Sequence, residues 1–255
     1  TYTGAIDPLL GMAKIAREHC IWFHVDGAYG LPGILDPSKA DFYQGLEFAD
    51  SVVVDPHKWL GAWVGVAATF VRDREILRRA FTQEPADYLE GTIDNEDVTV
   101  DSLQHSLDDF GIPYFDYGVE LSSPSRGIIV WSMIKEIGLQ GYRERIIRHN
   151  NIASYIASVA QQHPQLELLL EPTLSICCFR FISSEINDLN VFNQRLARQL
   201  TRENNFIPTT TKINGQLAIR PCYIGARQEQ SQADGLIEAV LRIGNEMLQR
   251  LTNIE

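Results

Sequence analysis

The chain has 255 residues, of which 45% are hydrophobic, a size and composition that suit one large or two modest globular domains. Its 33 acidic and 22 basic side chains give a net charge of −11, which argues against nucleic acid and against an anionic membrane as partners. No apolar run has the length of a membrane span and no basic-then-apolar leader opens the sequence, so we expect a cytoplasmic protein.

The cysteines agree with a reducing compartment. Cys20, Cys177, Cys178 and Cys222 show no metal-ligand spacing, and two of them are adjacent in an apparent strand. We therefore expect buried free thiols rather than disulfides or metal ligands, and we predict no metal site.

The first predicted elements lead to an aspartate. An apolar stripe over residues 8–20 predicts a helix, and residues 21–26 predict a buried strand that ends at Asp26. A strand–helix–strand order favours a parallel sheet, in which ligands bind at the carboxyl ends of the strands. Gly27 and Ala28, which follow, allow a flat ligand to approach the backbone closely.

A lysine follows the next predicted strand. The β-branched run Ser51–Val54 predicts a buried strand, and the proline after Asp55 must end it because proline cannot donate to a sheet ladder. Lys58 comes next, and an apolar setting would lower the pKa of a lysine and free its neutral amine for Schiff-base chemistry. A lone lysine after a strand is usually an ordinary surface residue. The aspartate at the end of the earlier strand favours the chemical interpretation, because a lysine and a carboxylate together suit pyridoxal phosphate.

Three stretches carry a resemblance to a known family. His24 to Tyr29 (HVDGAY), Asp55 to Trp59 (DPHKW) and Thr3 to Pro8 (TGAIDP) resemble the group II pyridoxal-phosphate-dependent amino-acid decarboxylases in sequence, order and spacing. Lysine followed by tryptophan favours the aromatic-L-amino-acid branch. In relatives a long N-terminal half precedes these motifs, so the resemblance implies that the corresponding half of this protein is missing from the chain.

The resemblance implies fold type I, the aspartate-aminotransferase fold, which is an α/β architecture. Residues 1–138 would form the C-terminal part of the large parallel-sheet domain, with a long acidic loop at 82–118, and residues 139–255 a small α+β domain. The remaining patterns predict a strand at 64–71, helices at 74–81, 125–137, 142–162, 189–204 and 230–252, and strands at 166–171, 174–182, 206–211 and 216–221.

The resemblance also implies the cofactor site. Lys58 would carry pyridoxal 5′-phosphate as an internal aldimine, Asp26 would pair with its ring nitrogen, and Ala28 would touch one face of the ring. His57 is expected near the phosphate or the aldehyde carbon. Asp55 and Thr1 are expected around the cofactor, and Asp55 departs from several relatives, which have asparagine there.

Tyr88 lies where relatives carry a tyrosine on a mobile loop that covers the active site. A phenol there can protonate the reacting carbon, and tyrosine rather than phenylalanine is typical of amine-forming relatives. The alternative is that Tyr88 only anchors the loop by packing. For three arginines, Arg126, Arg180 and Arg220, we expect ion pairing or anchoring ahead of a direct role with substrate.

We therefore expect a homodimeric enzyme that decarboxylates an L-amino acid to the amine and carbon dioxide, and the resemblance favours an aromatic substrate. One alternative is another fold type I enzyme, such as an aldehyde synthase, aminotransferase or lyase, since Lys58 and Asp26 would serve all of these. The other is a non-catalytic fragment that acts as a dimerisation module, although the presence of both residues argues against it.

Overall fold

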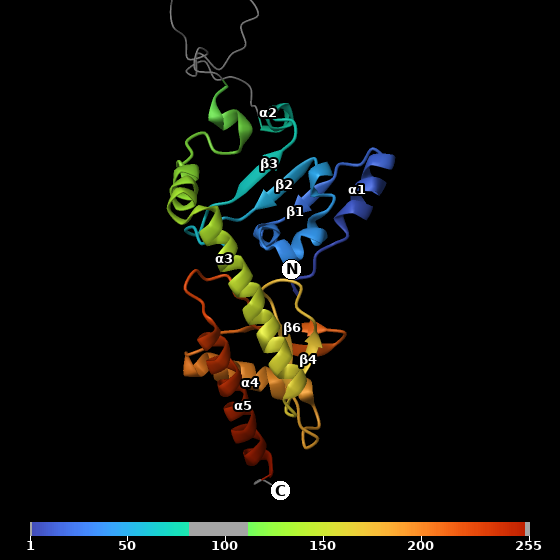
Figure 1. The fold of residues 1–255 in the computed structure, drawn as a ribbon, viewed down its shortest axis with the longest axis vertical. Coiled ribbons are helices and arrows are strands. Elements are labelled where there is room, and N and C mark those ends of the chain that lie inside the picture. Colours follow the sequence, from blue (N-terminus) through green and yellow to red (C-terminus); the bar gives the residue numbers. More distant parts are fainter. Residues whose placement is uncertain (1, 82–111, 253–255) are drawn as a thin grey trace, which may run out of the picture.

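The computed structural model describes residues 2–81 and 112–252, which form two sheets joined by a long helix (Figure 1). The first sheet has the order β1-β2-β3 and consists of β1 (His24–Asp26), β2 (Ser51–Val54) and β3 (Ala68–Val71). β1 and β2 run parallel, as the strand–helix–strand order predicts, and β3 runs antiparallel to β2. The carboxyl ends of β1 and β2 therefore lie at the same edge of the sheet.

Short helices surround this sheet. α1 (Leu9–Glu18) packs its small and apolar side chains against Phe23 and Ala49. Between β1 and β2 the chain forms three 3-10 helices, η1 (Leu31–Leu35), η2 (Pro37–Tyr43) and η3 (Leu46–Phe48), and α2 (Glu75–Phe81) follows β3. The described end of the predicted acidic loop contains one further 3-10 helix, η5 (Tyr114–Tyr117).

The two strands that precede the predicted site are less buried than the sequence predicts. The strand predicted at 21–26 begins only at His24, because the Asp50 carboxylate, and not a strand backbone, accepts the Phe23 N–H at 2.8 Å. Asp26 is exposed and the middle of β2 is only half-buried. β1 is an edge strand among the described residues, so one of its sides has no neighbouring strand there.

The second sheet is antiparallel throughout and has the order β4-β5-β7-β6. Its strands are β4 (Leu166–Leu170), β5 (Cys178–Phe181), β6 (Thr209–Ile213) and β7 (Gln216–Arg220). Phe179 and Phe181 join the main core with residues of α3 (Arg126–Gln162), α4 (Leu189–Glu203) and α5 (Gln230–Thr252). Cys178, on the opposite face, belongs to a second cluster with Ile176 and Ala218, and Tyr29 from the first half of the chain packs against this cluster. This is the α+β arrangement that the sequence pattern predicts.

One predicted strand of this sheet is too long. Residues 174–182 were expected to be extended, yet the ladder holds only Cys178–Phe181. Ser175 leaves the ladder because its backbone N–H donates to Tyr29 Oη at 3.1 Å, and Ile176 forms only an isolated bridge with Cys222.

α3 connects the two sheets (Figure 1). Gly138, with φ of 69° and ψ of 167°, interrupts the helix, which confirms the predicted break at this residue. The helix resumes directly afterwards, without the short linker implied by helices at 125–137 and 142–162. The domain boundary near residue 138 remains a prediction.

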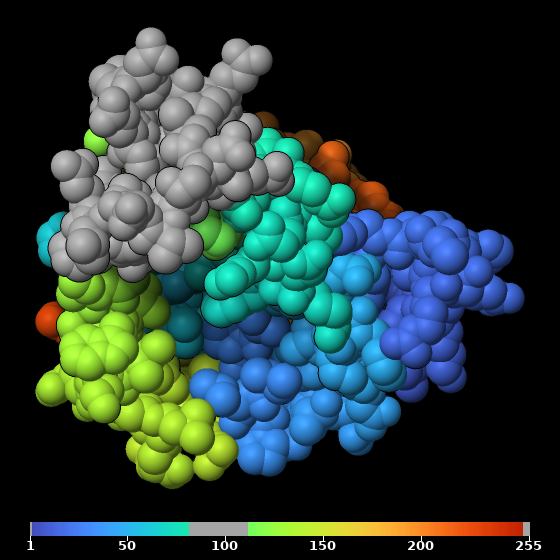
Figure 2. Space-filling model, turned by 90° about the horizontal axis from the view of Figure 1, so that it is seen from above, coloured from blue at the N-terminus to red at the C-terminus, as the bar shows by residue number. Residues whose placement is uncertain are grey.

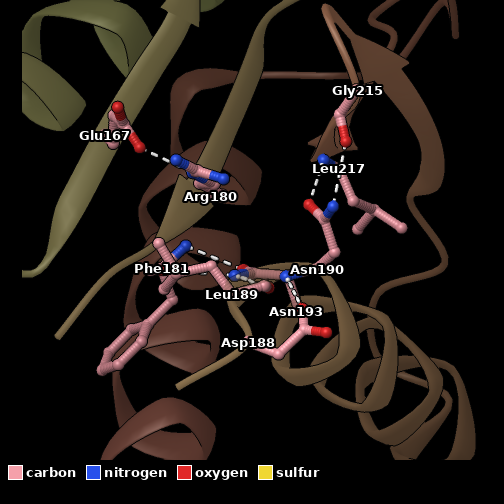
Figure 3. Close-up of polar contacts among 9 residues, drawn as sticks. All are labelled: Glu167, Arg180, Phe181, Asp188, Leu189, Asn190, Asn193, Gly215 and Leu217. Atoms are coloured by element: carbon pink, nitrogen blue, oxygen red, sulfur yellow. Dashed lines mark hydrogen bonds and ion pairs between the residues drawn. The ribbon is translucent and has the colours of Figure 1, made fainter. Parts of the chain in front are cut away.

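Side-chain contacts stabilise the C-terminal half (Figure 3). Asn193 is fully buried, donates to the Phe181 and Leu189 carbonyls, each at 2.9 Å, and accepts the Phe181 N–H at 2.8 Å. Asn190 bonds Leu217 N and Gly215 O in a similar way at a more exposed position. These two asparagines link α4 to the strands of the second sheet.

The arginines behave as expected from the sequence. Arg180 forms an ion pair with Glu167 at 2.6 Å across β4 and β5 (Figure 3). Arg126 pairs with Glu120 at 2.6 Å, and this pairing lowers the pKa of the Glu120 carboxyl to about 2. Arg220 donates to the backbone carbonyl of Tyr2.

The cysteines are free, and two of them are buried as predicted. Cys177 and Cys178 lie in the core, where burial raises the pKa of both thiols. Cys20 is exposed, so the expectation of burial is wrong for it, because it occupies a turn after α1 with φ of 52°. Along residues 2–81 and 112–252, no helix combines the length and the apolarity that a membrane crossing needs.

Candidate active site

The carboxyl ends of β1 and β2 bring two loops together. Asp26 pairs with Val53 in the parallel register, and beyond the strands Asp55 N donates to Ala28 O at 3.1 Å. The loop that carries the aspartate and the loop that carries the lysine are therefore hydrogen-bonded to each other. Neighbouring loops at such a sheet edge are a common place for a ligand site.

A cavity of about 240 Å³ lies at this edge, and three of the predicted site residues line it. These are Asp26, Ala28 and Lys58. The opening segment at residues 4–7 supplies another wall, and Leu174 reaches the cavity from the C-terminal half. The sheet edge and the C-terminal half thus form one concave site.

A larger hollow among the described residues is not lined by any of the predicted site residues. It measures about 650 Å³ and lies beside α1 and the start of β1. Its charged side chains are engaged internally, since Arg72 donates to the carbonyls of Glu47 and Ala49 and Arg17 lies over the Phe48 ring. Figure 2 shows a further recess between the first 80 residues, in blue and teal, and the start of α3, in yellow-green.

Asp26 is held by its own loop. Its Oδ1 accepts the Ala28 N–H at 3.0 Å, so the carboxylate is oriented by a two-residue turn. His24 lies two residues earlier on the same exposed face of β1, but its Nδ1 is 2.7 Å from Ser51 Oγ. Ser51 also accepts the Trp22 indole N–H at 2.9 Å. His24 is therefore fixed to β2 by a hydroxyl that it shares with Trp22.

Residues 55–62, here called the lysine turn, place Lys58 beside a carboxylate. Lys58 Nζ lies 2.8 Å from Asp55 Oδ2, and the Lys58 side chain is 37% exposed. The expectation of an apolar setting is thus wrong, because Lys58 is partly exposed and lies next to a carboxylate. The reason is local, because the backbone bond from Lys58 N to Asp55 O closes a tight turn that brings the two side chains together.

His57 and Asp55, two further predicted site residues, do not line the cavity. His57 Nδ1 donates to the Val66 carbonyl at 2.6 Å, which defines its tautomer, and its Nε2 lies 4.0 Å from Asp55 Oδ2. The Asp55 carboxylate is therefore close to two basic side chains, Lys58 and His57. Thr1 and Tyr88, the other two predicted residues, lie outside the described residues.

The sequence motifs did not identify the buried side chains that support the Asp26 loop and the lysine turn. Trp59 is fully buried and stacks on Tyr29, with ring centroids 5.2 Å apart. Its indole N–H donates to His149 Nδ1 at 2.9 Å, and Tyr29 Oη lies 2.6 Å from Ser175 Oγ. The aromatic residues after Lys58 and Asp26 could have signalled a packed support. No sequence signal pairs them with residues of α3 and the C-terminal sheet.

Burial determines the protonation states of His149 and Tyr29 in this support. Desolvation lowers the pKa of His149 to about 4, with the positive charges of Arg148 and Arg145 adding to the effect. His149 is therefore neutral at ordinary pH, with Nδ1 available as an acceptor. Desolvation also raises the pKa of Tyr29, so its hydroxyl keeps its proton.

The chain is similar in sequence to known proteins over most of its length. A family model described as "Pyridoxal-dependent decarboxylase conserved domain" matches residues 1–182. An aromatic-L-amino-acid decarboxylase of Bacillus atrophaeus is 29% identical over 230 residues, which cover 89% of this chain and 45% of that protein. A phenylacetaldehyde synthase of Petunia hybrida is 27% identical over 229 residues, which cover 86% of this chain and 43% of that protein.

Solved structures confirm fold type I. The crystal structure of Oryza sativa TDC with PLP and tryptamine superposes with a TM-score of 0.83 at 22% identity, covering 97% of this chain and 49% of that one. Mouse CSAD gives a TM-score of 0.79 at 24% identity. The chain spans about half the length of the curated relatives it matches. Because the family model covers well over half of the chain, the chain belongs to the pyridoxal-dependent decarboxylase family.

Proposed function

We propose that the full-length protein decarboxylates an aromatic L-amino acid to its amine with the help of pyridoxal 5′-phosphate. The observation that carries the proposal is that Lys58 and Asp26 line one cavity at the carboxyl ends of two parallel strands. Relatives named as aromatic-L-amino-acid, tyrosine and tryptophan decarboxylases support the reaction and the substrate class.

The side chains of the cavity fit the cofactor by their chemistry. Lys58 offers a primary amine to an aldehyde, and Asp26 offers a carboxylate to a protonated ring nitrogen. Ala28 has a small side chain, which leaves room for a flat ring against the backbone. When bound, pyridoxal phosphate supplies an electron sink for the bond that breaks as the carboxylate leaves.

Each residue has a defined task in this proposal. Asp26, oriented by the Ala28 N–H, keeps the ring nitrogen protonated. Lys58 holds the cofactor and must first separate from Asp55, 2.8 Å away. His57, fixed by Val66 O, keeps Asp55 in place from the other side. Thr1 binds near the cofactor in the same proposal.

Tyr88 is proposed to deliver a proton to the carbon that has lost its carboxylate. A closed loop around it would also exclude water and oxygen from that carbon. Proton delivery by this phenol is what would direct the reaction to the amine.

A second candidate is an aldehyde synthase. Phenylacetaldehyde synthases of Petunia hybrida and Arabidopsis thaliana are 27% and 26% identical to the chain, close to the identity of the decarboxylases. Product analysis distinguishes the two. A decarboxylase releases amine and carbon dioxide, whereas an aldehyde synthase consumes oxygen and releases aldehyde, carbon dioxide, ammonia and hydrogen peroxide in place of the amine.

We further propose that the site is completed by a segment equivalent to the first half of the relatives and by a second subunit in a cytoplasmic homodimer. The coverage of about half of each relative supports the first part. Apolar side chains are exposed on β3 and at the start of α3, among them Phe70, Trp131 and Ile134. They support the proposal that another segment or subunit covers this surface. A monomer in sedimentation of the full-length, cofactor-loaded protein would refute the dimer.

The test of the function uses Lys58→Ala in the full-length protein, with the exposed Lys14→Ala as the matched control. We expect the control to show the visible absorbance of lysine-bound cofactor and to release carbon dioxide from an aromatic amino acid. Lys58→Ala should show neither. Retention of that absorbance in Lys58→Ala would exclude Lys58 as the attachment site.

A further inference from the structure

The lysine turn rests on a column of buried side chains. Trp59 stacks on Tyr29 with 10° between the ring planes, and it lies nearly parallel to His149, with 15° between planes and centroids 6.5 Å apart. The indole N–H bond to His149 Nδ1 adds a directional contact to the two ring contacts. The ring of Trp59 is thus fixed in both position and rotation.

Both ends of this column are anchored in the C-terminal half. His149 belongs to α3, and Ser175, which is fully buried, both contacts Tyr29 Oη through its own Oγ and donates its backbone N–H to it. Trp59 directly follows Lys58 in the chain, and Tyr29 lies three residues after Asp26. The column therefore connects both predicted cofactor-binding loops to one rigid support.

Two hydrogen bonds, one of them from α3, also hold the backbone around Trp59. Arg145 of α3 donates to the Leu60 carbonyl at 3.1 Å, and Ala62 N donates to Pro56 O at 2.9 Å. Between these contacts only the Lys58 side chain leaves the lysine turn toward the cavity. The direction of the Lys58 side chain consequently depends on the position and orientation of Trp59.

We propose that Trp59 is a positioning residue, whose hydrogen bond to neutral His149 sets the direction in which the lysine turn presents the Lys58 amine to the cavity. The ligand that this amine meets rests on the proposed function, but the positioning itself does not. Without the bond, the indole could rotate between its neighbours, and Lys58 would leave both the cavity and Asp55. His149 Nδ1 would then have no donor, because it would face the apolar edge of a ring.

The experiment measures Lys58 in two ways in the full-length protein. Trace labelling with acetic anhydride, followed by peptide mass spectrometry, gives the reactivity of Lys58 relative to Lys14, Lys39, Lys135 and Lys212 and needs no cofactor. Capture of pyridoxal phosphate by the apo-protein, fixed by borohydride and located by mass spectrometry, gives the productive orientation of the same amine.

Trp59→Phe keeps an aromatic ring and removes the N–H donor together with part of the indole, so His149→Leu, which removes the same bond from the acceptor side, serves as the second variant. We expect relative labelling of Lys58 to rise about fivefold and capture of pyridoxal phosphate to fall by a similar factor, which corresponds to one neutral hydrogen bond. The two changes have opposite signs because the amine becomes freer in solution and worse directed in the cavity. A variant that merely unfolds would instead raise the labelling of all the lysines together.

Four further variants sharpen the test. Trp63→Phe is the matched control, since Trp63 lies close by in the chain but is 82% exposed, and it should change neither readout. His149→Asn keeps an acceptor near the place of Nδ1 and should behave nearly as wild type, whereas His149→Leu should reproduce Trp59→Phe. The double variant Trp59→Phe/His149→Leu should be no worse than either single one, because both remove the same bond.

Unchanged relative labelling of Lys58 in Trp59→Phe would overturn the proposal, whatever the capture assay gives. A shifted labelling pattern with no attachment of pyridoxal phosphate to Lys58 in the wild-type protein would support the positioning role and refute the proposed function. Equal effects of His149→Asn and His149→Leu would also overturn the proposal, because the acceptor would then be irrelevant.

Discussion

Lys58 Nζ lies 2.8 Å from Asp55 Oδ2, so the amine proposed to bind the cofactor is held by a carboxylate of its own turn. An amine that is engaged with a carboxylate of its own turn is not available to attack an aldehyde. The ion pair therefore has to open before attachment of the cofactor. Asp55 therefore opposes the capture step.

Replacing this carboxylate should speed up capture. We expect Asp55→Asn to raise the rate at which apo-protein attaches pyridoxal phosphate by about threefold, in line with the strength of a partly exposed ion pair. The rate is measured from the growth of visible absorbance after mixing. Asp41→Asn, which removes an exposed carboxylate bonded to Gln44, is the control and should leave the rate unchanged. A slower rate in Asp55→Asn would mean that Asp55 acts on the cofactor itself.

His149 should make the stability of the fold depend on pH. Its pKa is about 4 in the folded protein against 6.5 ordinarily, so between these values the unfolded chain binds a proton that the folded chain does not. Its contribution is complete above this window and is lost as the pH falls through it. We expect the free energy of unfolding to drop by about 2 kcal/mol from this group between pH 7.5 and pH 5.

Urea unfolding at the two pH values checks this expectation. His149→Asn removes the titrating group and should lose that part of the pH dependence. His19→Asn, which changes an exposed histidine, should keep it. The same pH dependence in all three proteins would show that another group is responsible.

Asn193 should contribute more to stability than its neighbour Asn190. Asn193→Ala leaves the buried Phe181 N–H and C=O unpaired, and we expect a loss of about 3 kcal/mol in the free energy of unfolding. Asn190→Ala exposes its partners to water and should cost about 1 kcal/mol. Urea midpoints measure both, and equal losses would contradict the role of burial.

Tyr88→Phe tests the choice between amine and aldehyde. If the phenol protonates the reacting carbon, the variant in the full-length protein should form less amine and release aldehyde and peroxide, since phenylalanine cannot donate a proton. Chromatography of the products with a peroxide assay measures the split. Amine as the main product at near wild-type rate would assign Tyr88 a packing role only.

Local patterns were sufficient for most of the helices and strands. The helices predicted at 189–204 and 230–252 are observed as Leu189–Glu203 and Gln230–Thr252, because their apolar periodicity is contained within each segment. The strand predicted at 174–182 failed at its start, where Ser175 bonds Tyr29 from a distant part of the chain. Contacts of this kind override a local preference for extended structure.

The site was predictable in part for the same reason. The sequence motifs identify Asp26, Ala28 and Lys58, which line one cavity, because each motif includes its own strand end. The Lys58–Asp55 pair was missed, although a spacing of three residues in a tight turn could have suggested it. The Trp59–His149 bond joins residues 90 apart in the chain and leaves no trace in either local pattern.

The contact of Arg220 with the backbone of Tyr2 has a consequence for biosynthesis. These residues are 218 positions apart, and the same opening segment meets Ile176 at Gly4. On the ribosome, the Tyr2 carbonyl must wait for its partner Arg220 until β7 has been synthesised. Contacts of such long sequence separation form slowly. The contact of Arg220 with the opening segment, which forms a wall of the cavity, is therefore a late step, formed after all the lining residues up to Leu174 have been synthesised.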